Sequence, residues 1–448
     1  MELPTSIMAR LKTLSGRRTA FAVVLVLLLV PILGQAATYQ PPANGRASAP
    51  PSAINSSDDV TFVTIQGNTA GKGAAIYAVD TESKAVLWSH DSYYKKYFDV
   101  DPLDDSTILF TAMVNDWPWN GGESYPWYAI IYDWRNDTLI DKFPVPADTH
   151  DVDYIGGQKY VIADKTIHNG QHEAYLTLAK KRGWISDDRE ATWHRLYVYN
   201  NSKDDIVWEY NFSDHYPETA GDGIGNHQDF THVNDVDLVL DGRAFLTSPR
   251  EFDRVLLINR TTKETIWELG QEDNYSILHE QHNPVLLSNT PPTVLVADSE
   301  NNRVVEYEKR GDEWVRTWLY AKGLDWPRDA DRLPNGNTLV TDTANGRIIE
   351  LTPQGEIAWQ YNTTFGPYDA ERLAYGDEPR GPRMSTLNGE TTTVQEQSYI
   401  SARIDQYFFL SQWVLPRWVD RSTFWLIHLW VLMFGGWSFV EIRATLNG

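Results

Sequence analysis

The chain has 448 residues, no cysteine, and 61 acidic against 39 basic residues, a formal net charge of −22. The lack of cysteine excludes disulfides, thiolate metal sites and cysteine nucleophiles, and the acidic balance argues against general nucleic-acid binding, which needs a basic face. The 18 tryptophans and 23 tyrosines favour an extensive β core over disorder.

Residues 1–38 carry a basic flank, which includes Arg17 and Arg18, followed by an apolar run from Thr19 to Gly34. This order is typical of a secretory signal peptide or of an uncleaved N-terminal anchor whose basic side stays in the cytoplasm. The sequence leaves these two alternatives open. Residues 39–58 are rich in Pro, Ala, Ser and Asn and predict a flexible stalk.

Residues 59–380 repeat a unit that closes on an aromatic strand. The six closing motifs lie at 86–90, 140–143, 206–210, 266–269, 317–320 and 357–361. The unit at 325–361 is the plainest and contains four short strands separated by turn signals such as Pro334-Asn335-Gly336-Asn337. Four strands per repeat predict an all-β fold, a six-bladed β-propeller.

The segment Pro367–Leu373 echoes Pro327–Leu333, the first strand of the unit before it, but no outer strands follow it. We therefore expect the N-terminal strands, 60–65, 74–79 and 85–88, to complete that last blade. Closure by both ends of the propeller would leave no open sheet edge.

Residues 381–421 are expected to form a linker and an interfacial segment, and residues 422–441 a transmembrane helix, because 423–440 is apolar and long enough to cross hydrocarbon. A buried terminal helix is the alternative. Seven Asn-X-Ser/Thr sequons, at 55, 136, 200, 211, 259, 274 and 362, fit an exported glycoprotein. We expect a protein of the cell membrane whose propeller lies on the extracytoplasmic side.

Basic and proton-exchanging residues recur at the starts of the predicted inner strands. Alignment of the repeats places His232, His282 and Trp326 in one register and His150, Asn234 and Arg328 in a register two residues later. Strand side chains alternate with period two, so both registers face the same way. Arg250, after the second strand of its blade, could reach the same channel mouth. This pattern predicts chemistry on an anion.

Two other interpretations compete with this one. The residues could be hydrogen-bonding caps that join adjacent blades, or the three histidines could bind zinc. An arginine inside a metal shell is electrostatically unfavourable, so we expect no metal and no cofactor. A non-catalytic surface propeller that binds a glycan or a partner protein is the alternative function, because a fold does not fix an activity.

Over residues 149–361 the sequence resembles the bacterial arylsulfate sulfotransferases, through His232, Asn234, Arg250 and the Gln281-His282 pair. The resemblance implies transfer of a sulfuryl group from an aryl sulfate to a phenolic or other hydroxyl acceptor, by a ping-pong mechanism through a sulfohistidine. It implies His282 as the nucleophile and His150 as a further channel histidine. The N-terminal β-sandwich and the cysteine pair of that family are missing here.

Physical chemistry assigns compatible roles. Arg250 offers a planar fork for two sulfuryl oxygens, and His232 is suited to proton exchange with the leaving and entering hydroxyls. His150 and Asn234 would hold the remaining oxygens, while Arg328 could bind substrate or pair with Asp329 or Asp331. The sequence does not define the oligomeric state.

Overall fold

The computed structural model consists of two compact units, residues 45–406 and a second unit made of 1–44 with 407–448. The structure describes residues 5–38, 60–67, 73–91, 94–114, 127–145, 149–166, 193–217, 220–221, 229–363, 366–387, 407–408, 411, 415, 419 and 421–446. The predicted stalk, the sequon at Asn55 and most of the predicted linker lie outside these residues.

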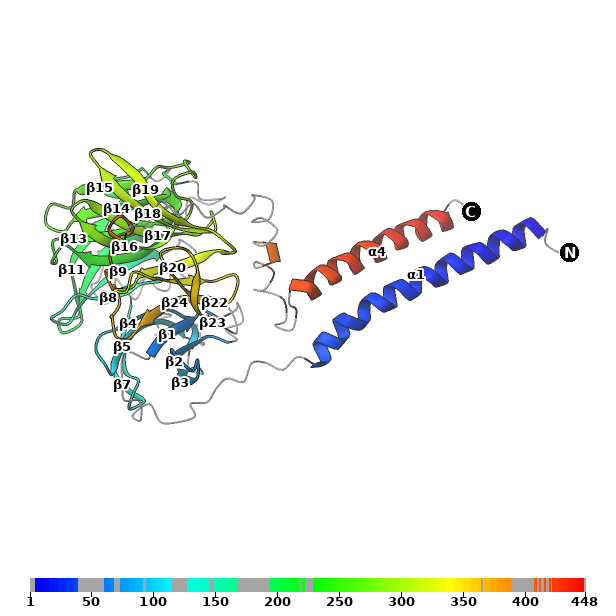
Figure 1. Ribbon diagram of the computed structural model, residues 1–448, viewed down its shortest axis with the longest axis horizontal. Coiled ribbons are helices and arrows are strands. Elements are labelled where there is room, and N and C mark those ends of the chain that lie inside the picture. The colour runs from blue at the N-terminus through cyan, green and yellow to red at the C-terminus, as the bar shows by residue number, and fades with distance from the viewer. Residues whose placement is uncertain are drawn as a thin grey trace. The chain divides into compact units, whose positions relative to one another are not determined.

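The larger unit is a six-bladed β-propeller, as predicted (Figure 1). Its first two complete blades contain β4 (Tyr94–Pro102), β5 (Thr107–Val114), β6 (Trp127–Asp133) and β7 (Thr138–Pro144), then β8 (Val152–Tyr154), β9 (Lys159–Thr166), β10 (Trp193–Asn200) and β11 (Asp205–Asn211). The next contains β12 (Val233–Val239), β13 (Ala244–Pro249), β14 (Arg254–Asn259) and β15 (Thr265–Gly270).

Two further blades follow in the same antiparallel order. They contain β16 (His282–Asn289), β17 (Pro292–Asp298), β18 (Arg303–Arg310) and β19 (Glu313–Tyr320), then β20 (Pro327–Arg332), β21 (Thr338–Asp342), β22 (Arg347–Leu351) and β23 (Ile357–Asn362). The five blades from β4 to β23 each end on a strand that overlaps one of the aromatic closing motifs identified in the sequence. The spacing of the aromatic closing motifs therefore predicted these blades correctly.

The sixth blade is built from both ends of the propeller, as the echo of Pro327–Leu333 predicted. Strand β24 (Pro367–Arg372) pairs antiparallel with β1 (Val60–Ile65), which continues into β2 (Ala75–Asp80) and β3 (Val86–His90). Arg372 fastens the junction, because its Nη1 donates to Thr61 Oγ1 at 2.6 Å and its Nη2 to Glu350 Oε2 at 2.7 Å. The ring therefore closes by hydrogen bonds between residues about 300 positions apart in the chain.

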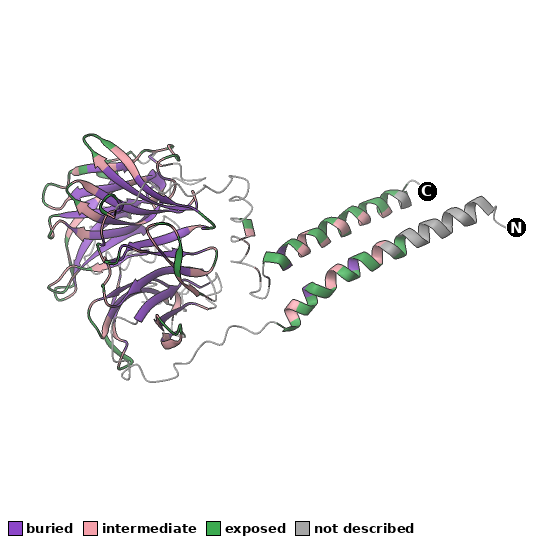
Figure 2. Cartoon of the chain, in the orientation of Figure 1, coloured by how far each residue is buried: buried purple, intermediate pink, exposed green. Residues whose placement is uncertain are grey.

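The inner strands are the first of each blade, with β24 in the closing one. Strands β8, β12, β16, β20, β24 and β4 contact one another in that order around the channel. Apolar side chains between neighbouring sheets form the core, one cluster joining Leu246 and Val255 of one blade to Val294 and Leu319 of the next. The strands are mostly buried (Figure 2). Such packing fixes where each inner strand begins.

Residues beyond the predicted propeller end at 380 also pack on it. Gly381 N donates to Arg332 O at 2.7 Å, and Met384, in the short helix η5 (Met384–Thr386), is fully buried. The sequon at Asn200 is 4 % exposed at the end of β10, which disfavours it as a glycan attachment site.

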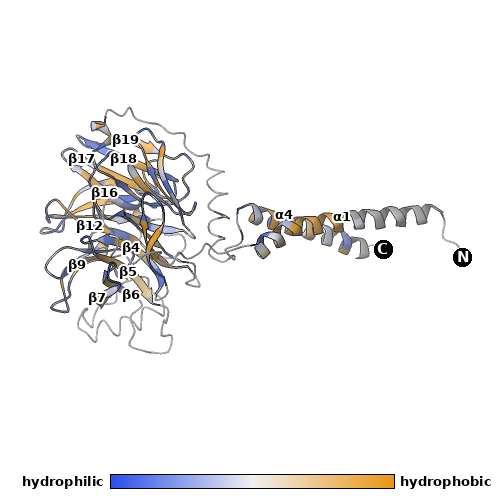
Figure 3. Cartoon of the chain, turned by 60° about the horizontal axis from the view of Figure 1, so that its bottom comes forward, coloured by the Kyte–Doolittle hydropathy of each residue, from blue (hydrophilic) through white to orange (hydrophobic). Residues whose placement is uncertain are grey.

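The smaller unit contains two helices long and apolar enough to cross a membrane, α1 (Thr5–Thr38) and α4 (Arg421–Leu446). Apolar residues run along α4 and along the coloured part of α1 (Figure 3). They contact each other: Arg18 pairs with Glu441 at 2.6 Å, and Trp430 Nε1 donates to Leu25 O at 3.1 Å. In the apolar window of each helix 11 % of the residues are buried, which suits a membrane span better than the buried terminal helix that was the alternative for α4.

Candidate active site

His150 lies two residues before β8 and is surrounded by aromatic rings. Its ring stacks on Phe98 with centroids 4.6 Å apart, and it meets the edges of His232 at 5.6 Å and Tyr368 at 5.4 Å. These three partners come from three different blades and His150 comes from a fourth, so closure of the ring brings them together. The side chain is 8 % exposed, and its Nδ1 has no hydrogen-bond partner within the described part of the chain.

His232, just before β12, is oriented by a carboxylate. Its Nδ1 lies 2.6 Å from Asp229 Oδ2. An ionised carboxylate can only accept a hydrogen bond, so Nδ1 carries the proton and Nε2 is left to exchange protons with another group. His232 also has a left-handed backbone, with φ of 40°, which is uncommon for a residue with a side chain. The ring is thus held in one tautomer.

His282, the first residue of β16, is oriented in the same way by a hydroxyl. Its Nδ1 lies 2.8 Å from Ser299 Oγ, and that hydroxyl donates its single proton to Pro327 O at 2.7 Å. Ser299 must therefore accept from His282 Nδ1, which leaves a lone pair on Nε2 of the neutral ring. This is the tautomer that a nucleophilic histidine requires.

The three histidines affect one another's charge. Burial lowers the pKa of His150, His232 and His282 well below the ordinary value of 6.5, and nearby cations lower it further. The strongest of those cations is Lys165 for His150, Arg250 for His232, and Arg328 for His282. At neutral pH all three rings are therefore uncharged.

Arg250 lies beside His232 but is already paired. Its Nε and Nη2 both donate to Glu251 Oε1, at 3.0 and 2.5 Å, and Nη2 lies 3.2 Å from Glu280 Oε2. Although burial alone would lower the pKa of Arg250, these two carboxylates raise it overall. Burial raises the pKa of Glu251 to about 7 against the opposing effect of Arg250. Two of the three guanidinium nitrogens of Arg250, which were predicted to bind sulfuryl oxygens, therefore already contact carboxylates of the protein.

Arg328, in β20, has no carboxylate within ion-pair distance among the described residues. Its guanidinium lies 4.2 Å from the ring centroid of Trp326 and 4.9 Å from that of Tyr368, and its Nη1 donates to Gln66 Oε1 at 2.6 Å. It is 5 % exposed, and its Nε has no partner in the described structure. Burial lowers its pKa to about 10. The alternative for Arg328, an ion pair with Asp329 or Asp331, is not observed, so Arg328 is more available than Arg250 to bind an anionic substrate.

Asn234 forms a hydrogen bond between two neighbouring blades. Its Nδ2 donates to Gln281 O at 3.0 Å, and Ser248 Oγ donates to the same oxygen at 3.2 Å. The capping interpretation therefore holds for this residue, and the bonds position the peptide that precedes His282. One oxygen, Asn234 Oδ1, is buried without a partner in the described chain.

The predicted common register does not hold fully. His232 and Trp326 both precede an inner strand with left-handed φ, 40° and 54°, whereas in β16 the left-handed residue is Asn283, one position after His282. The ladder shifts near the start of all three strands, between Val233 and Val236, between His282 and Val285, and between Pro327 and Asp329, so the position of the left-handed residue is the feature that sets β16 apart. The His282 and Trp326 rings are nevertheless neighbours, with centroids 6.2 Å apart.

Sequence reasoning missed three residues of this site. Asp229 precedes His232 by three positions, a spacing that could have suggested a pair; Ser299 and the buried Lys165 carried no local signal. The residues placed to share a metal here are Asp229, His232 and Glu251, whose ligand atoms lie within 4.8 Å of one another, and not the three histidines. Glu251 is engaged by Arg250, so the zinc interpretation gains little from the geometry.

Comparison with known proteins does not identify a function, so the residues of the site must indicate one. No protein-family model matches the sequence, and no curated protein is significantly similar to it. Among solved structures, a protein of unknown function from Bacteroides caccae shares 12 % identity over 68 % of this chain and 94 % of its own, with a TM-score of 0.45. A candidate 6-phosphogluconolactonase from Bacteroides fragilis shares 11 % over 71 % and 99 %, with a TM-score of 0.43.

Proposed function

We propose that the protein is a membrane-anchored sulfotransferase that moves a sulfuryl group from an aryl sulfate to a hydroxyl acceptor. The proposal rests on two neighbouring residues. His282 is neutral and oriented by the hydroxyl of Ser299, and the buried Arg328 near it lacks a carboxylate partner in the described structure. A nucleophile beside an uncompensated cation suits attack on an anionic ester.

In the first half-reaction, Nε2 of His282 attacks sulfur, and the S–O bond to the aryl group breaks. The bonding pair leaves with the phenolate, and the sulfuryl group stays on nitrogen as a sulfohistidine. Such transfers resemble phosphoryl transfer, in which charge spreads over three peripheral oxygens and fixed donors provide most of the catalysis. Arg328, and the Arg250 nitrogen not bound to Glu251, would face those oxygens.

In the second half-reaction, Nε2 of His232 takes the proton of the acceptor hydroxyl while its oxygen attacks sulfur. The N–S bond breaks, His282 regains its lone pair, and His232 then releases its proton to the phenolate or to water. The lowered pKa of His232 favours this basic role over protonation of the first leaving group. Asp229 stabilises the imidazolium that forms. His150 and Asn234 are assigned to holding the substrate and shaping the site.

Anchoring is proposed through α1 and α4. The basic residues before the apolar part of α1, Arg17 and Arg18 among them, favour a cytoplasmic location for the N-terminal end of α1. The propeller, between the two helices in sequence, would then lie on the extracytoplasmic side.

The test is an assay of full-length protein in detergent with a chromogenic aryl sulfate and a phenol acceptor. Wild type should release the chromophore and carry an acid-labile sulfuryl label, and His282→Ala should do neither. His215→Gln is the matched control, because His215 lies in an exposed loop stacked on Tyr210. Full activity of His282→Ala would refute the nucleophile. No release by the wild type would favour a non-catalytic binding propeller.

A further inference from the structure

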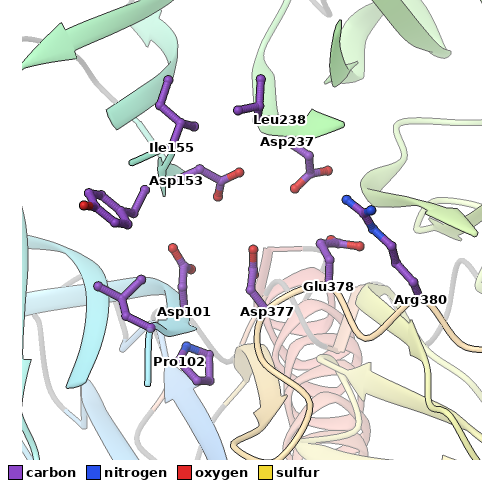
Figure 4. A pocket seen from close by; sticks show the side chains of 11 residues that line it. Asp101, Pro102, Asp153, Ile155, Asp237, Leu238, Asp377, Glu378 and Arg380 are labelled. Atoms are coloured by element: carbon purple, nitrogen blue, oxygen red, sulfur yellow. The ribbon is translucent and has the colours of Figure 1, made fainter. Parts of the chain in front are cut away.

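A second polar site lies farther along the channel, beyond the histidines. It is a cavity of about 430 Å³ where β4, β8 and β12 end. Its charged lining consists of Asp101, Asp153, Asp237, Asp377, Glu378 and Arg380. Figure 4 shows the carboxylates of the four aspartates turned toward one another across the cavity. Five carboxylates therefore face one guanidinium.

This cavity is distinct from the candidate active site. Along β12, Asp237 follows His232 by five residues, and a strand rises roughly 3.3 Å per residue, so the two ends lie about 16 Å apart. The same direction holds in β8, where Asp153 follows His150. Nothing in the proposed transfer uses these carboxylates.

Two of the carboxylates are buried without a full set of partners. Asp101 is 2 % exposed and Asp237 is 7 % exposed, and each keeps one oxygen, Asp101 Oδ1 and Asp237 Oδ2, with no hydrogen-bond partner among the described residues. Both oxygens belong to side chains that line the cavity. A buried, unpaired carboxylate oxygen is costly, and a ligand that supplies positive charge would remove the cost.

The oxygens are also close enough to share an ion. Ligand atoms of Asp153, Asp237 and Asp377 lie within 4.8 Å of one another, and so do those of Asp99, Asp101 and Asp153. Asp153 belongs to both groups. A cation in the cavity could therefore draw oxygens from three blades and from the segment after β24.

We propose that this carboxylate cavity binds a divalent cation, with Ca²⁺ as the ion its chemistry fits, held by Asp153, Asp237 and Asp377 with Asp101 alongside. The charged donors are hard oxygens from separate elements, which suits the 6–8 oxygen ligands and flexible geometry of Ca²⁺ better than the strict octahedron of Mg²⁺. By joining three inner strands, the ion stabilises the ring itself.

The segment that carries Asp377 is held firmly in place. A Cβ added to Gly381 would lie 2.2 Å from Leu333 O, so only glycine permits the approach of this segment to β20. Arg332 Nη1 donates to Pro382 O at 3.0 Å, and Glu306 accepts from Met384 N. Asp377 is thus presented by a fixed backbone, which lowers the entropic cost of binding an ion.

Arg380 competes with a bound cation for the carboxylates of the cavity. Burial raises the pKa of Asp377 to about 6, and burial together with neighbouring carboxylates raises the pKa of Asp237, whereas Arg380, which lines the same cavity, lowers both. One guanidinium cannot neutralise five carboxylates. Because Arg380 is exposed, it can turn toward solvent when a divalent ion enters.

The test is Ca²⁺ binding by full-length protein in detergent, after EDTA treatment and dialysis, measured by calorimetry and by thermal melting in 0.5 M NaCl to screen the acidic surface. Wild type should bind Ca²⁺ saturably, and its Tm should rise by roughly 5 °C at 100-fold excess over Kd. No saturable binding, together with equal Tm in EDTA and CaCl₂, would overturn the proposal.

Single substitutions of the cavity aspartates test where the ion binds. Asp153→Asn and Asp237→Asn should weaken Ca²⁺ binding at least tenfold, yet melt higher than wild type in EDTA because they relieve repulsion. Asp241→Asn is the matched control: it lies in the turn after β12, is exposed, and should bind like wild type. Wild-type Ca²⁺ affinity in both cavity variants would refute this location. If either fails to fold, Glu378→Gln, on the loop after β24, replaces it and should bind Ca²⁺ less tightly.

Discussion

Asp229 Oδ2 accepts a hydrogen bond from Nδ1 of His232 at 2.6 Å, between residues three positions apart at the entrance of an inner strand. The bond fixes the tautomer and stabilises the imidazolium that a general base becomes. It gives His232 an orienting carboxylate, an arrangement that catalytic histidines share across unrelated folds.

Asp229→Asn should therefore lower sulfuryl transfer to a phenol by about 100-fold or more, the range in which general-base catalysis contributes. The amide can donate to Nδ1 and so favour the wrong tautomer. Steady-state rates with a chromogenic aryl sulfate would measure the loss, with Asp241→Asn as the charge-matched control. An unchanged rate in Asp229→Asn would mean that His232 is not the base.

The pH dependence of transfer follows from the lowered pKa of His232 and His282. Since a lowered pKa keeps each ring neutral further into acid, the nucleophile and the base should both remain active as the pH falls through 6.5. A profile of kcat/KM between pH 5 and 8 should lose activity only below pH 6.5. A limb centred at or above 6.5 would contradict the buried, neutral state of these rings.

Arg328 and Arg250 should respond differently to replacement by methionine. Arg328→Met removes a buried cation that lacks a carboxylate partner in the described chain, so KM for the aryl sulfate should rise about 10- to 100-fold, with Tm unchanged or higher. Arg250→Met removes the cation that pairs with Glu251 and Glu280 and should lower Tm. Steady-state kinetics and melting curves of the two variants would measure these effects. A lower Tm for Arg328→Met than for Arg250→Met would contradict the prediction.

The buried pair of Arg332 and Glu306 should matter for stability. Both side chains are 0 % exposed and lie 3.1 Å apart, and Glu306 also accepts from Met384 N. Glu306→Gln should cost about 3–5 kcal/mol, because it leaves the Arg332 charge buried without its counter-ion. Urea unfolding followed by tryptophan fluorescence would measure it. Asp241→Asn should stay within about 0.5 kcal/mol of wild type, as exposed substitutions usually do.

The helix pair predicts that α1 is retained in the mature protein. Arg18 forms two hydrogen bonds with Glu441, and Phe21 packs edge-on against Trp437 with centroids 5.1 Å apart. These contacts would be lost on cleavage after Gly34 or nearby. Mass spectrometry of the membrane-purified protein should find peptides from residues 19–38. A mature N-terminus after residue 34 would show instead that the segment is a signal peptide.

The blades could be predicted from the sequence because their signals are local. The alternation of apolar residues, the turn at Pro334–Asn337 and the aromatic closing strands depend on neighbours a few positions away. The echo of Pro327–Leu333 at Pro367–Leu373 even predicted the closing blade. The histidines at strand starts were found by the same repeat logic.

The partners of those residues depend on contacts that no local pattern contains. Arg328 meets Gln66 from 262 positions away, and Asp369 Oδ2 accepts from Val100 N across the closed ring. The aspartates of the inner strands entered the sequence alignment only as repeat markers. Their meeting around one cavity required all the strands to point the same way through the channel.

The sequence by itself determined the six-bladed ring, the apolar terminal helices and the set of basic residues at the channel mouth, because short-range periodicity and hydrophobicity encode them. Only the tertiary structure decided which cation is neutralised, which nitrogen of each histidine is left available, and where the carboxylates converge. Those properties depend on distances between blades, and ring closure alone sets such distances.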